Sequence, residues 1–208
     1  MSGCCGHDAK FDGVSVAYKR RLWAVIILNA GMFGVEMSAG YLAGSQALQA
    51  DALDFFGDAL TYGISLAVIG KSINIRTSAA LFKGVSLFLM GFWVLGSTIY
   101  RVFYMNVPEA EIMGIIGFLA LLTNLASVML LVRYKDGDAN VRSVWLCSRN
   151  DAIGNVAVMI AALGVWGTTS GWPDVIVAVT MAGLFLSSAF QIVLQALSER
   201  RQLHRHSV

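Results

Sequence analysis

The chain has 208 residues, of which 57% are hydrophobic and only 13% are charged, and its formal net charge is +2. Soluble domains carry roughly 45–50% apolar and about 25% charged residues, so this composition excludes an ordinary soluble domain. The small net charge gives no sign of a nucleic-acid partner. The three cysteines, two of them adjacent at Cys4 and Cys5, predict no disulfide framework. The polar first twenty residues indicate no cleavable signal peptide.

Six apolar segments are each long enough to cross a bilayer, which takes about 20 residues in a helix. They predict an all-α membrane protein with six transmembrane helices, at residues 22–43, 46–70, 78–103, 110–132, 142–167 and 174–196. The connections between them are short. We expect an N-terminal tail over residues 1–20, one transmembrane domain over 21–196, and a tail over 197–208 too short for a core of its own.

The basic residues predict the orientation of the chain, because lysine and arginine collect in cytoplasmic loops. Thirteen of the fifteen lie near the termini or the second and fourth connections: Lys10, Lys19, Arg20, Arg21, Lys71, Arg76, Lys83, Arg133, Lys135, Arg142, Arg200, Arg201 and Arg205. Both termini are therefore expected in the cytoplasm, with the chain in the inner (cell) membrane.

Within the predicted spans lie the charged residues Glu36, Asp51, Asp54, Asp58, Arg149 and Asp151. A charged side chain at the centre of a membrane helix costs about 2.5–3.5 kcal/mol on insertion scales. The chain can carry several only if they face a polar interior, pair with one another, or bind a cation. A structural network of ion pairs is one interpretation, but the acids outnumber the single arginine, which favours a functional site.

The aspartates of the second segment are spaced for joint action. Asp54 and Asp58 are four residues apart and share one helix face, and Asp51 extends that stripe toward the outer end. Two carboxylates this close repel each other, so one should hold a proton unless a cation is bound. The pattern is typical of a site that exchanges protons for a metal ion.

The fifth segment carries a matching stripe. Cys147 and Asp151 are four residues apart, and Asn155 follows one turn later. Facing the helix of the aspartates, Cys147 and Asp151 would complete a set of three carboxylates and one thiolate. A tetrahedral mixture of sulfur and oxygen favours zinc, and cadmium more than an all-oxygen site would.

Cys147 could instead be a packing residue, as a lone buried cysteine often is. The ligand set would then slide by one turn and use Asp151 and Asn155 together with the pair on the second helix. An amide in an otherwise oxygen-only site would favour manganese or iron. The residues leave both sets open.

Two stretches resemble a known family: "GYLAGSQALQADALDFFGDAL" (Gly40 to Leu60) and "NVRSVWLCSRNDAIGNVAV" (Asn140 to Val158). They are similar to the second and fifth helices of cation diffusion facilitators, six-helix antiporters of divalent metals and protons. The resemblance implies that Asp54, Asp58, Cys147 and Asp151 are metal ligands. Cys147 departs from the family pattern, which usually has histidine or aspartate there, so the preferred metal stays open.

The family's cytoplasmic metal-binding domain normally follows the sixth helix and supports dimerisation. We expect this chain to be a short form without it, so that the expected homodimer is held by the membrane part alone. Glu36 and Asn124 also resemble family positions.

The expected function is proton-coupled export of zinc, with cadmium as a further substrate, by a secondary transporter rather than an enzyme. The metal is then transported cargo, and the partners are protons, the lipid bilayer and a second copy of the chain. A manganese, iron or cobalt transporter of the same fold and a non-transporting metal sensor are alternatives. An aspartyl protease using Asp54 and Asp151 is another, although no segment marks peptide binding. Cys4, Cys5 and His7 could collect metal or belong to an ordinary tail.

Overall fold

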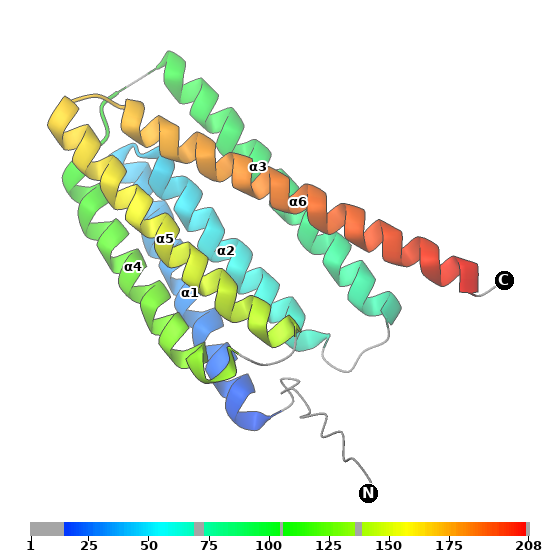
Figure 1. Cartoon of the computed structure of the whole chain (residues 1–208). Coiled ribbons are helices and arrows are strands. Elements are labelled where there is room, and N and C mark those ends of the chain that lie inside the picture. Colours follow the sequence, from blue (N-terminus) through cyan, green and yellow to red (C-terminus); the bar gives the residue numbers. More distant parts are fainter. Residues whose placement is uncertain (1–14, 69–72, 105, 136–138, 207–208) are drawn as a thin grey trace, which may run out of the picture.

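A computed structural model describes residues 15–68, 73–104, 106–135 and 139–206. The side chains of residues 73–74, 76, 139–147 and 199–206 lie outside this description, as do Cys4, Cys5 and His7. The described chain is helical throughout (Figure 1): α1 Val16–Ala43, α2 Gln46–Ala67, α3 Ile73–Phe103, α4 Ala110–Leu131, the 3-10 helix η1 Val132–Tyr134, α5 Ala139–Thr168 and α6 Trp172–His206.

The six predicted segments all correspond to long helices, so the all-α class is confirmed. Five of these helices are long and apolar enough to cross a membrane. α2 is not among the five, and it is the helix that carries three aspartates. The predicted segments end within about one residue of the observed ends of α1, α3 and α5, at Ala43, Phe103 and Thr168. In contrast, α6 continues ten residues beyond its predicted end at 196. Its polar last turns satisfy their own backbone hydrogen bonds without needing an apolar surrounding.

The short connection predicted between the first two helices is observed as a glycine-serine turn. Gly44 ends α1 in the left-handed conformation, with φ of 64°, and its N–H bonds back to α1 carbonyls. Ser45 then caps α2, and its hydroxyl accepts a hydrogen bond of 3.0 Å from the N–H of Leu48. The chain therefore reverses within two residues, and α1 and α2 pack side by side.

The helices fall into two groups. α1, α2, α4 and α5 form a bundle, whereas α3 packs chiefly against α6. Small residues allow this second pairing, because a Cβ at Gly84 would lie 2.7 Å from Val193 Cγ2 and one at Gly91 would lie 2.8 Å from Leu186 Cγ. In Figure 1, the start of α3 and the end of α6 lie well apart from the start of α1.

Candidate metal-transport site

Three of the four residues predicted as metal ligands meet where α2 packs against α5. Asp54 and Asp58 lie one turn apart on α2, as their spacing predicts. The carboxyl group of each interacts with that of Asp151 on α5. The two stripes therefore face each other, and the role of these acids as ligands stays a prediction.

A cavity of about 390 Å³ reaches these acids between the two helix groups. Its wall is formed by α2, α3, α5 and α6, and includes Asp54, Asp58 and Asp151. Thr61 of α2 and Asn150 of α5 extend the wall toward the end of the molecule that holds the second and fourth connections. An ion in the cavity would thus meet oxygen ligands from two helices at once.

Cys147 lies in α5, but its side chain is outside the described residues. Among the described side chains, no three of the types His, Cys, Asp and Glu are placed to hold a metal ion together. The three aspartates therefore share a cavity without forming a closed metal centre in this conformation.

Tyr62 supports the site in a way that the sequence reasoning missed. Its side chain is fully buried, and its hydroxyl donates a hydrogen bond to Asp58 Oδ2. The same hydroxyl lies 3.3 Å from the hydroxyl of Ser148 on α5. The four-residue spacing from Asp58 to Tyr62 was a local signal for this contact, because residues four apart are neighbours on a helix.

A second buried polar cluster lies about one turn from these acids, toward the α1–α2 turn. Asn155 Nδ2 donates to Asp51 Oδ2 at 2.7 Å, and Asn155 Oδ1 accepts from Asn124 Nδ2 at 2.9 Å. Glu36 is fully buried beside Asp51, and its carboxyl oxygens accept no hydrogen bond among the described residues.

The end of the molecule that holds the α1–α2 turn is tied together by Asp174, in the first turn of α6. Its carboxylate accepts hydrogen bonds from Ser45 Oγ at 2.6 Å, Gln46 N at 2.8 Å and Ala47 N at 3.0 Å. Arg101 of α3 donates to the carbonyl oxygen of Gly44 at 2.7 Å. Both members of the α3–α6 pair are therefore bonded to the α1–α2 turn.

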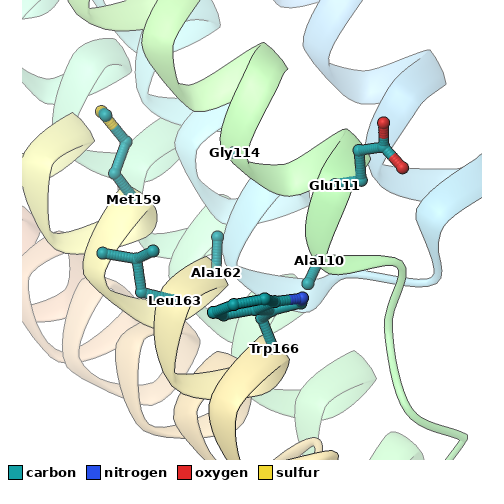
Figure 2. A pocket seen from close by; sticks show the side chains of 7 residues that line it. All are labelled: Ala110, Glu111, Gly114, Met159, Ala162, Leu163 and Trp166. Carbon is teal, nitrogen blue, oxygen red and sulfur yellow. The ribbon is translucent and has the colours of Figure 1, made fainter.

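A further cavity of about 370 Å³ lies between α4 and α5, away from the aspartates. Figure 2 shows Met159, Ala162, Leu163 and Trp166 on one wall, and Ala110, Glu111 and Gly114 on the other. Its walls are mainly apolar, and Leu163 and Trp166 are exposed at the bundle surface. This surface suits lipid chains, and we assign it no part in ion binding.

Comparison with known proteins places this geometry in a family. The model of the cation efflux transmembrane domain matches residues 22–199. The chain belongs to this family. The resemblance to the cation diffusion facilitators that the helix motifs indicated is thereby confirmed.

Several curated relatives of the cation efflux family align with most of this chain. A Yersinia pestis protein named zinc transporter ZitB is 29% identical over 196 residues, which are 87% of this chain and 62% of that protein. A Bacillus subtilis protein named cadmium, cobalt and zinc/H(+)-K(+) antiporter is 24% identical, covering 85% of this chain and 61% of its own length. The Cupriavidus metallidurans metal cation efflux system protein CzcD is 25% identical, covering 92% and 63%. The chain thus spans about three fifths of the length of these relatives.

Proposed function

We propose that this chain exports divalent transition-metal ions, zinc and also cadmium, from the cytoplasm in exchange for protons. The observation that carries the proposal is the shared cavity of Asp54, Asp58 and Asp151, which are drawn from two helices of a membrane domain. The names of the curated relatives agree with a divalent-metal substrate.

Burial of these acids supports a cation as the ligand. Asp54, Asp58 and Asp151 are at most partly exposed, and carboxylates removed from water need protons, partners or a metal. A metal ion binds only deprotonated ligands, so an arriving metal ion displaces protons from the site. Arriving protons in turn release the metal ion. The site can therefore couple metal export to proton import without a further component.

The open side of the cavity and the tie at the opposite end support alternating access. The cavity wall reaches Thr61 and Asn150, toward the end that the basic residues predict to be cytoplasmic. The bonds of Asp174 and Arg101 hold the other end closed. We propose that this arrangement is the inward-facing state, and that separation at Asp174 opens the outer side.

The exchange has an electrical cost. Export of one Zn²⁺ against one H⁺ moves one net positive charge outward, which a negative-inside potential opposes by about 2.3 kcal/mol per 100 mV. The proton gradient, an excess of cytoplasmic metal or a second proton must supply this free energy. We propose an inner-membrane location with both termini cytoplasmic, and a homodimer formed through the membrane domain.

Cys147 is our proposed fourth ligand. Asn155 is already engaged with both Asp51 and Asn124, and it does not line the cavity of the three aspartates. This supports the set with Cys147 over the set with Asn155. A thiolate suits zinc and cadmium better than manganese or iron.

Flux measurements test the proposal. Purified protein in liposomes with an imposed pH gradient should move both zinc and cadmium, and Asp54→Ala should abolish both. Glu111→Gln removes an exposed acid outside the site and should transport like wild type. Cys147→Ser should weaken cadmium flux more than zinc flux, because sulfur ligation favours the softer ion. Metal binding by wild type without flux that depends on Asp54 would favour a sensor instead.

A further inference from the structure

A lysine lies within the cavity of the three aspartates. Lys83 of α3 forms part of the same wall as Asp54, Asp58 and Asp151, and it attracts Asp58 electrostatically. Its sequence position suggested only a charge near the second connection. A fixed positive charge in the path of a metal ion is unexpected, because it repels the proposed cargo.

Close packing holds Lys83 in this position. The next residue, Gly84, lies so close to α6 that a Cβ would be 2.7 Å from Val193 Cγ2. Leu87, one turn later on the face of Lys83, also lines the cavity. A Cβ at Gly57 of α2 would lie 3.6 Å from Leu87 Cδ2. This face of α3 is therefore turned toward α2, with Lys83 one turn from the contact.

Lys83 and the aspartates that it attracts lie on different groups of helices. The three aspartates belong to the bundle, whereas Lys83 belongs to the α3–α6 pair on the other side of the cavity. When no metal is bound, the lysine offsets part of the negative charge of the acids. When a divalent ion enters, it must compete with that lysine for the same carboxylates, and the lysine then assists its departure by repulsion.

We propose that Lys83 is a built-in counter-ion of the transport site that sets its affinity for divalent metal. This inference rests on the proposed function of the site. With Lys83 present, the site binds metal less tightly than three aspartates alone would, and it releases the metal faster. Lys83 also reduces the net negative charge of the empty site while the transporter returns to its inward-facing state.

The test compares KM and the maximal rate of zinc uptake in liposomes for Lys83→Gln, Lys83→Arg and wild type. We expect Lys83→Gln to lower KM by about tenfold and to lower the maximal rate as well, because attraction of the ion is stronger and its release slower. Lys83→Arg keeps the charge and should return both values toward those of wild type. Lys135→Gln removes an exposed lysine outside the cavity and controls for surface charge.

An unchanged or raised KM in a Lys83→Gln protein that elutes as a folded species would overturn the inference. Zinc binding to the detergent-purified protein separates this result from the proposed function, since binding requires no transport. A Lys83→Gln protein that binds zinc about tenfold more tightly than wild type, while neither transports it, would support the counter-ion and overturn the exporter. Transport by wild type with equal zinc affinity in both proteins would do the reverse.

Discussion

Asn155 of α5 donates a hydrogen bond of 2.7 Å to Asp51 of α2, and this bond joins the two helices about one turn from the candidate metal ligands. Both residues are almost completely buried. The acids lie in two layers: Asp54, Asp58 and Asp151 line the cavity, whereas Asp51 and Glu36 are buried and are not part of its wall. Asp51 therefore helps to hold α2 and α5 together beside the site.

Asn155→Ala should destabilise the protein without removing its metal site. The substitution leaves Asp51 Oδ2 and Asn124 Nδ2 without their buried partners, at a cost of about 1–3 kcal/mol in the free energy of unfolding. Denaturation with sodium dodecyl sulfate measures this loss, and Gln191→Ala, at an exposed position on α6, is the matched control. Zinc affinity should fall by less than about threefold, or roughly 0.6 kcal/mol. A loss of all zinc binding would instead assign Asn155 to the ligand set.

Tyr62→Phe should weaken metal binding while keeping the packing of the ring. The phenol hydroxyl orients Asp58, and a hydrogen bond to a charged group contributes about 1.5 kcal/mol or more. If part of that orientation is lost, zinc affinity should fall by about fivefold, which corresponds to about 1 kcal/mol. Titration calorimetry measures the change, with the exposed Tyr100→Phe as control. Equal affinity in wild type and Tyr62→Phe would show that Asp58 is positioned without the tyrosine.

Asp174→Asn should loosen the outer end. The carboxylate accepts three hydrogen bonds from the start of α2, and an amide of the same size cannot accept all of them. We expect a loss of about 2 kcal/mol in the free energy of unfolding. If separation at Asp174 opens the outer side, a cysteine-reactive probe added from outside should also reach a cysteine introduced at Ala50 faster in this variant. Unchanged accessibility would contradict the assignment of Asp174 to an outer gate.

Gly44→Ala should destabilise the turn, whereas Gly31→Ala should not. Gly44 has φ of 64°, a backbone conformation that residues other than glycine rarely adopt. A Cβ there would also lie 2.3 Å from Arg101 Nη2. We expect a loss of at least about 1 kcal/mol in the free energy of unfolding. Gly31 lies in α1 with nothing within 4 Å of a built Cβ, so alanine there should leave stability unchanged or slightly raised. Equal stability of the two variants would contradict the strain at Gly44.

The sequence alone predicted the features that local patterns encode. Apolar length predicted the helices, and four-residue spacing placed Asp54 with Asp58 on one face of α2. The two-residue gap between the first two apolar segments predicted a short connection at Gly44. These features depend on residues that are close along the chain.

Contacts between distant parts of the chain could not be predicted in the same way. Asp174 bonds to Ser45 across 129 positions of sequence, and no local pattern links them. Lys83 was grouped with the loop charges because hydropathy cannot say which face of α3 meets the aspartates. The packing of α3 against α6 at Gly84 decides this, and it depends on the tertiary fold.

Whether α2 and α5 jointly hold one metal ion can be measured most directly by X-ray absorption spectroscopy of the zinc-loaded protein. With Cys4 and Cys5 replaced by serine, Cys147 is the one remaining cysteine of the three. We predict one bound zinc with one sulfur neighbour at about 2.3 Å and oxygen neighbours at about 2.0–2.2 Å. The sulfur signal should disappear in Cys147→Ser, and zinc binding should disappear in Asp54→Ala. A zinc shell without sulfur, or one that persists when Asp54 is removed, would contradict a shared site of Asp54, Asp58, Cys147 and Asp151.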